Sequence, residues 1–336
     1  MDTMPDVKNA SKPMLRYSFW IIFMLVAAFT FRGYWDYSTA QRLDPQGWDT
    51  LANGMGDAPA QYRVAVIDTA KHLIKLSHGH LSYRHFFALF DFIASLCSCL
   101  LIRGILLRTP SFVQADKLSQ YLRLALLLGL TSYYLYWSLW YQRPETWACT
   151  LYVALSFYLL SAVRSPGLVF FGLVGLSIVQ GFVRADVAIL FHFALFLYVL
   201  LRGTSGFLVG KGVLLPASIL SGIFSTAILW VLIHKIFPNA VYGGDKKVFE
   251  LLTNLGPGQL VPFLIFIAPT VYTYLNDKAE GSVGKGPGFT LLLASVFYLI
   301  SWVTVGRAQE VRIFVPYAFA LMPQTVNALA RRLELD

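Results

Sequence analysis

Arginine and carboxylate residues occur together in three short segments that separate long apolar runs. These segments are Arg143-Pro144-Glu145, Arg184-Ala185-Asp186, and the stretch that runs from Arg307 through Glu310 to Arg312. A guanidinium group binds two phosphate oxygens at once, and a carboxylate can accept a proton or hold a metal ion. In each segment, the arginine and the carboxylate can also simply neutralise each other at a helix end. Three such segments on one face indicate a shared polar site for an anionic substrate.

Four more residues have types that could complete this site. Arg63 lies in the polar stretch Gln61-Tyr62-Arg63, and Asp36 follows the first apolar run by a few residues. Tyr136 and Trp140 belong to an aromatic stretch that leads to Arg143. Tyr and Trp rings collect at membrane interfaces for physical reasons alone, but the same rings also stack on sugars. The aromatic stretch is therefore either an interfacial belt or a sugar-binding wall.

Asp91 and His192 differ from the others because each lies about two turns inside an apolar run. Ionisable residues at such a depth mark proton relays in transporters. A hydrogen-bonded packing role is the simpler interpretation of both residues, and more clearly so for His192.

The composition places all of these residues in a membrane protein. Of 336 residues, 57% are hydrophobic and 13% are charged, against about 45–50% and 25% in soluble domains. The mean hydropathy is +0.59. These values exclude nucleic-acid-binding proteins, cytosolic dehydrogenases and secreted disulfide-linked domains. The net charge of +9 therefore indicates membrane lipid with anionic headgroups as the partner, and no nucleic acid.

Ten apolar runs are long enough to cross about 30 Å of hydrocarbon. They predict an all-α integral membrane bundle of about ten transmembrane helices, with residues 1–336 forming a single multi-span membrane domain. Two neighbouring runs are short and are linked only by Arg184-Ala185-Asp186. The runs are Tyr17–Phe31, His85–Leu107, Tyr121–Trp140, Thr146–Val163, Gly167–Val183, Val187–Leu201, Val213–Ile236, Gln259–Leu275, Phe289–Val305 and Ile313–Ala330.

The one long polar segment, residues 32–84, is predicted to be an outward loop. Within it, residues 61–76 repeat apolar side chains at helical spacing. These positions are Tyr62, Val66, Ile67, Ala70, Leu73 and Ile74. This pattern predicts an amphipathic helix that lies on the membrane surface or packs on the bundle. With the first loop set aside, Lys and Arg concentrate in the segments on the side of the termini, so the positive-inside rule predicts cytoplasmic termini.

This layout resembles the C-type membrane glycosyltransferases and related bacterial polysaccharide-assembly proteins. The resemblance is carried by the segments Arg32-Gly33-Tyr34-Trp35-Asp36, Ala60-Gln61-Tyr62-Arg63-Val64 and Glu310-Val311-Arg312-Ile313-Phe314-Val315-Pro316. It implies sugar transfer from a polyprenyl-phosphate donor at the outward face of a bacterial inner membrane, with Asp36 as the base. The chain lacks the paired acidic motif and the C-terminal soluble domain of better-defined members. The sequence therefore leaves two alternatives, a reaction that uses a divalent metal ion as cofactor and a reaction that uses none.

Two functions of different classes fit these residues. In a transferase, Arg63, Arg184 and Arg312 hold the carrier phosphate. A carrier or flippase for an anionic or lipid-linked substrate would use the same arginines together with Asp91 or His192, and a non-catalytic membrane subunit is a third alternative. An enzyme needs its polar residues at one end of the bundle, whereas a carrier needs them near the midplane. The sequence favours one end.

No nucleotide cofactor is expected, because a donor that is already outside the cell needs no nucleotide site. The nearest sequence to a phosphate-binding loop, from Gly206 to Gly212, has the wrong spacing and lacks the Ser or Thr that would hold magnesium.

Overall fold

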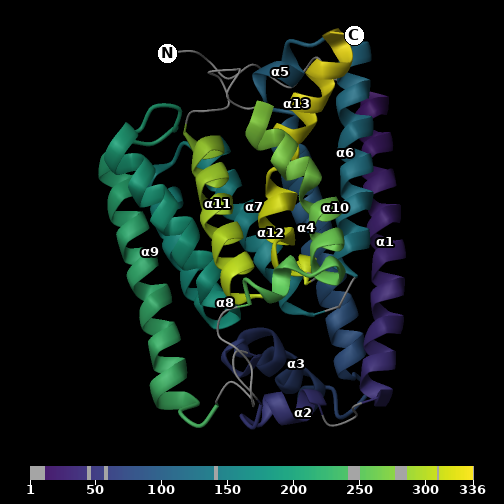
Figure 1. Ribbon diagram of the computed structural model, residues 1–336, viewed down its shortest axis with the longest axis vertical. Helices are drawn as coiled ribbons and strands as arrows, with labels where there is room; N and C mark the ends of the chain where they lie inside the picture. Colours follow the sequence, from purple (N-terminus) through teal and green to yellow (C-terminus); the bar gives the residue numbers. More distant parts are fainter. Residues whose placement is uncertain are drawn as a thin grey trace.

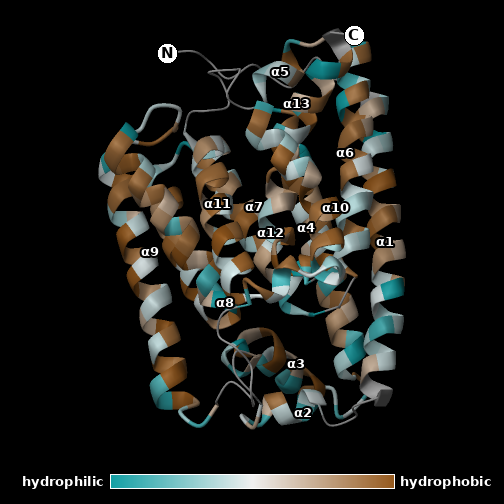
Figure 2. Ribbon diagram, viewed as in Figure 1, coloured by the Kyte–Doolittle hydropathy of each residue, from teal (hydrophilic) through white to brown (hydrophobic). Residues whose placement is uncertain are grey.

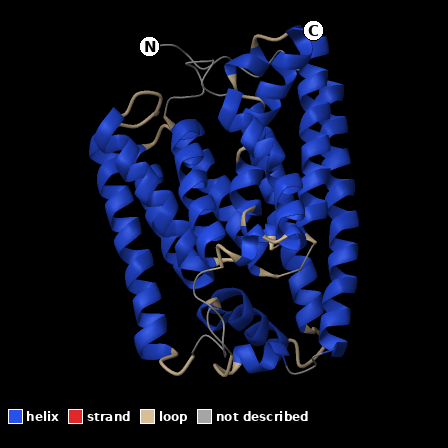
Figure 3. Ribbon diagram, viewed as in Figure 1, coloured by secondary structure: helices blue, strands red, loops and turns tan. Residues whose placement is uncertain are grey.

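The computed structural model describes residues 12–43, 47–56, 60–139, 143–240, 250–276, 286–308 and 310–335. Within these ranges the regular structure is entirely helical, with no strand (Figure 3). The prediction of an all-α protein is confirmed.

Thirteen α-helices lie in the described ranges (Figure 1). They are α1 (Lys12–Leu43), α2 (Gly47–Ala52), α3 (Val64–Leu76), α4 (Tyr83–Leu106), α5 (Pro110–Val113), α6 (Lys117–Ser138), α7 (Glu145–Ala162), α8 (Pro166–Arg202), α9 (Lys211–Val231), α10 (Pro257–Asn276), α11 (Pro287–Val305), α12 (Val315–Ala320) and α13 (Met322–Leu335). Four short helical turns connect them, namely η2 (Ala60–Tyr62), η3 (Leu232–Ile236), η4 (Thr253–Leu255) and η6 (Val311–Ile313).

Six helices in the described part of the chain are long and apolar enough to cross a membrane. They are α1, α4, α8, α9 with its continuation η3, α10 and α11. Large apolar side chains such as Phe31, Ile223 and Leu264 are exposed on them, as contact with lipid requires, and Figure 2 shows hydrophobic residues along the outer helices. The protein is therefore a multi-pass helical membrane protein.

The six candidate spans are fewer than the ten apolar runs of the sequence. Two runs merge in α8, and α6 and α7 are not among the six candidate spans. The last run is divided between α12 and α13, which have 6 and 14 residues.

Helix α8 changes direction at Arg184, whose backbone is extended (φ −161°, ψ 94°). Before this residue, the Gln180 side chain donates a hydrogen bond to Cys149 of α7. After it, His192 contacts Tyr152 of α7. A straight helix would carry His192 about 18 Å beyond Gln180, yet its partner lies only one turn from Cys149. The chain therefore folds back at Arg184, in the predicted link between two apolar runs.

The predicted amphipathic helix is present as α3. Val66, Ile67 and Ala70 form its buried face, as their spacing predicted, but Leu73, which the same spacing placed on that face, is 39% exposed. The helix begins at Val64 and not at residue 61, because Arg63 has non-helical dihedral angles and separates η2 from α3. Figure 1 shows α2 and α3 together at one end of the bundle, opposite the end where α13 finishes. We call these the α3 end and the α13 end.

Candidate functional site

Glu145, the first residue of α7, forms ion pairs with two arginines from distant parts of the chain. Its Oε1 lies 2.6 Å from Nη1 of Arg63 and 4.0 Å from Nη1 of Arg312. The side chains of Glu145 and Arg312 are only 9% and 5% exposed. An acidic residue in the first turn of a helix is favoured by the helix dipole. Glu145 thus joins the start of α3, the start of α7 and the turn η6.

Two further charged residues from the same predicted segments complete this arrangement. Nη2 of Arg312 lies 2.8 Å from Oε2 of Glu310, at the start of η6. Arg143 adds a third positive charge close to Glu145.

The carboxylate of Glu145 stays ionised in this environment, which lies outside the six candidate spans. Burial favours the neutral acid, but Arg63, Arg312 and Arg143 together lower the pKa of Glu145 to about 2. Burial lowers the pKa of Arg312 to about 10, so its guanidinium is charged at neutral pH. Both sides of the pair therefore carry full charge under physiological conditions.

A second charged group lies where α8 folds back. Nη2 and Nε of Arg184 bind Oδ2 and Oδ1 of Asp186 at 2.5 and 3.2 Å. The hydroxyl of Tyr298 in α11 lies 3.4 Å from Oδ2 of the same carboxylate, and its ring faces Arg184. Arg63 also acts electrostatically on both Asp186 and Tyr298. The two charged groups therefore adjoin each other.

We call these seven residues the arginine cluster; they are Arg63, Arg143, Glu145, Arg184, Asp186, Glu310 and Arg312. It contains four arginines and three carboxylates, so it carries one excess positive charge. Although Arg184 is buried, the Asp186 side chain is 46% exposed, and that of Glu310 is 31% exposed. The cluster therefore has an accessible edge, which is formed by two of its carboxylates.

The structure places the other predicted site residues elsewhere. Asp36 forms an ion pair with Arg32, one turn earlier in α1, at 3.4 Å. Arg307 is half-exposed and lies 3.8 Å from Glu250. Tyr136 is exposed on α6, and Trp140 lies outside the described residues. Their predicted roles stay predictions.

Two residues near the cluster were not anticipated. Tyr298 is one aromatic residue in a long apolar run, and nothing in its spacing indicates a contact with Asp186. Asn254 is buried and holds the loop that leads to η6: its amide donates to the carbonyls of Val303 and Gly306, and its carbonyl accepts from the Ala308 amide, all at 2.8 Å.

The two ionisable residues inside the spans have hydrogen-bond partners. The hydroxyl of Tyr37 donates to Oδ2 of Asp91 at 3.0 Å. The hydroxyl of Tyr152 lies 2.9 Å from Nε2 of His192. These contacts agree with the packing interpretation of Asp91 and His192.

Fold and site together define a multi-pass helical membrane protein with an arginine-rich polar site. Within the described residues, no group of three or more His, Cys, Asp or Glu side chains is arranged to hold a metal ion. Comparisons with known proteins find no matching family, no matching curated protein and no matching solved structure.

Proposed function

We propose that the protein transfers a sugar from a polyprenyl-phosphate-linked donor to an acceptor at the α3 end of the bundle. The observation that carries this proposal is the convergence of Arg63 and Arg312 on Glu145. Three helix ends meet there, so the arginines are held ready before any substrate binds. Preorganised guanidinium groups are suited to phosphate because they offer paired donors in a fixed plane.

The excess positive charge of the arginine cluster favours an anionic substrate. Asp186 and Glu310 lie at its accessible edge, so a phosphate that approaches from that side must displace one of these carboxylates from its arginine. The same charges stabilise the phosphate as a leaving group, which is the electrostatic role that a glycosyl transfer from a lipid phosphate needs.

The base that deprotonates the acceptor is Asp36 in this proposal, as the resemblance implies. Asp36 lies in the last part of α1, which runs toward the α3 end. Its carboxylate is 25% exposed, so an acceptor hydroxyl can reach it. Asp186 is the competing candidate, because it is more exposed and belongs to the arginine cluster.

The test of this function is an assay of the purified protein in liposomes with a panel of polyprenyl-phosphate sugars. We expect transfer by the wild-type protein and weaker donor binding by Arg184→Lys, seen mainly as an increased KM. Lys keeps the positive charge but loses the bidentate contact that Arg184 makes with Asp186. An equally conservative change outside the site, Arg332→Lys, serves as the control. Failure of the wild-type protein to transfer from any donor would contradict the proposal.

The chain crosses the membrane ten times in this proposal, because the two halves of α8 count separately and α6, α7 and the α12–α13 pair also cross. The α13 end then faces the cytoplasm of a bacterial inner membrane. We expect Met55→Cys, beyond α2, to react with an impermeant thiol reagent in intact cells. Ser205→Cys, after α8, should react only in disrupted cells. Cys97, Cys99 and Cys149 are replaced first, and the reverse labelling would overturn this topology.

The alternative function is a carrier or flippase for an anionic or lipid-linked substrate. A carrier would use the buried side chains of Asp91 and His192, which lie inside the bundle with Tyr37 and Tyr152 as hydrogen-bond partners. Liposomes that contain a fluorescent polyprenyl-phosphate lipid distinguish the two functions. Movement of the lipid between leaflets without sugar transfer would support the carrier.

A further inference from the structure

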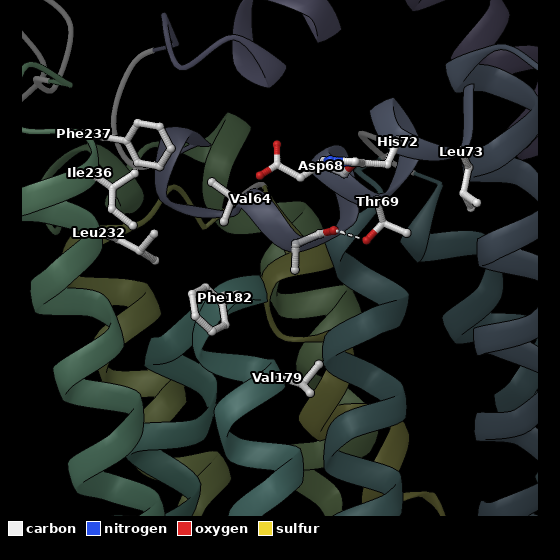
Figure 4. A pocket seen from close by; sticks show the side chains of 11 residues that line it. Val64, Asp68, Thr69, His72, Leu73, Val179, Phe182, Leu232, Ile236 and Phe237 are labelled. Atoms are coloured by element: carbon white, nitrogen blue, oxygen red, sulfur yellow. Dashed lines mark hydrogen bonds between the residues drawn. The ribbon is translucent and has the colours of Figure 1, made fainter. Parts of the chain in front are cut away.

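An apolar groove of about 580 Å³ lies between α3, the first half of α8 and η3, the continuation of α9. Figure 4 shows Val179 and Phe182 of α8 facing α3, with Leu232 and Ile236 of η3 to one side. Only Asp68, Thr69 and His72 of α3 bring polar side chains to its lining. The groove is therefore an apolar slot with one polar edge.

The groove lies between two candidate membrane helices and exposes apolar side chains. Val179 is 62% exposed, and Ile236 is half-exposed. A groove with an apolar lining of this kind accepts an apolar partner. Because α8 and α9 are both candidate spans, the apolar partner available to the groove is a lipid chain.

Both walls of the groove lead directly into the arginine cluster. Val64 lines the groove and follows Arg63, which binds Glu145. Phe182 lines the other wall, two residues before Arg184, which binds Asp186. At each of these two points, an apolar wall of the groove lies next to an arginine. A molecule with an apolar chain and an anionic head could therefore contact both.

We propose that this groove holds the apolar chain of a polyprenyl phosphate, with its phosphate at the accessible edge of the arginine cluster. This proposal rests on the proposed function, since it names the place where the lipid part of the donor binds. The one excess positive charge of the cluster complements a phosphate. The groove is a single slot, so we expect it to bind a single-chain lipid phosphate in preference to a two-chain phospholipid.

The experiment measures binding of a polyprenyl phosphate that carries no sugar but a photoreactive diazirine in its chain. Purified protein in nanodiscs is irradiated, and cross-linked peptides are identified by mass spectrometry. We expect labels on α3, on the first half of α8 and on η3. A phosphatidylglycerol probe with the same diazirine should label the outer faces of the spans without preference for the groove.

Blocking the groove provides the quantitative test. Val179→Trp fills it from an exposed position that needs no change in the core, and we expect the Kd for the polyprenyl phosphate to rise at least tenfold, or by about 1.4 kcal/mol. Leu73→Trp blocks the groove from the opposite wall and should act in the same direction. Ile223→Trp, on an exposed part of α9 that does not line the groove, should leave the Kd within about twofold.

The outcomes separate this proposal from the proposed function. Unchanged lipid binding by both Val179→Trp and Leu73→Trp would overturn the groove, even if the wild-type protein transfers sugar. Equal labelling of the groove by the phosphatidylglycerol probe would assign it to ordinary phospholipid and also overturn the proposal. Groove-dependent binding of the polyprenyl phosphate without any sugar transfer would support the groove and contradict the transferase.

Discussion

Glu145→Gln is expected to destabilise the protein strongly, by about 3–5 kcal/mol. Gln fills nearly the same volume but cannot neutralise Arg63 and Arg312, which both pair with the Glu145 carboxylate. Arg312 is almost fully buried and keeps Glu310 as a partner, but the short 2.6 Å contact between Arg63 and the Glu145 carboxylate is lost. The expected result is a lower unfolding temperature in detergent, measured by loss of helical circular dichroism, together with loss of donor binding.

Glu310→Gln provides the matched control. Glu310 also pairs with Arg312, at 2.8 Å, but its side chain is 31% exposed. A partly exposed pair contributes about 0–1 kcal/mol, so this variant should unfold close to the wild-type temperature. Equal unfolding temperatures for Glu145→Gln and the wild-type protein would show that Glu145 does not hold the cluster together.

The stability difference between the wild-type protein and Glu145→Gln should depend on pH, in a direction set by the pKa of Glu145. The folded protein lowers the pKa of Glu145 from 4.5 to about 2, so the ionised carboxylate stabilises the folded state at pH values above 4.5. This contribution is lost as the pH falls from 4.5 towards 2. The difference in unfolding temperature between wild type and Glu145→Gln should therefore be constant from pH 7 to pH 5 and shrink by pH 3.

The parts of the fold that depend on local pattern could be predicted from the sequence. The apolar period of residues 61–76 predicted α3 and its buried face, because the side chains of a helix repeat at a fixed angle. The interruption of two apolar runs at Arg184 predicted the place where α8 folds back. Hydropathy alone does not give the number of membrane crossings, because it does not separate a buried apolar helix such as α7 from a span.

The candidate site could be predicted only in part. Arg63, Glu145 and Arg312 were expected to share a site because each lies at a helix end on one face of the bundle, and the structure brings them together. Arg307 and Tyr136 met the same criterion but are exposed. Position along the chain fixes the level of a side chain in the bundle, whereas its direction around the helix axis depends on packing between distant helices. The contact of Tyr298 with Asp186 depends on such packing and left no signal in the sequence.

Asp36→Asn is expected to reduce sugar transfer by about 10²–10⁴-fold, because Asn keeps the size of Asp but cannot accept the acceptor's proton. The loss should appear in kcat and not in the affinity for the donor, since Asp36 pairs with Arg32 and stands outside the arginine cluster. Asp186→Asn should do the opposite and raise KM, because it removes the carboxylate that orients Arg184. The measurement is steady-state transfer by both variants in liposomes across a range of donor concentrations.

Arg32→Gln is the control that separates the base from its ion pair. It breaks the 3.4 Å contact with Asp36 but leaves the carboxylate in place, and the Arg32 side chain is exposed, so we expect near wild-type turnover. If Asp36→Asn turns over normally while Asp186→Asn loses kcat, the base is Asp186, and the reaction takes place at the exposed edge of the arginine cluster. Near-normal kcat in both variants would exclude both carboxylates as the base. In that case another group would accept the acceptor's proton, and the arginine cluster would serve donor binding in the transferase.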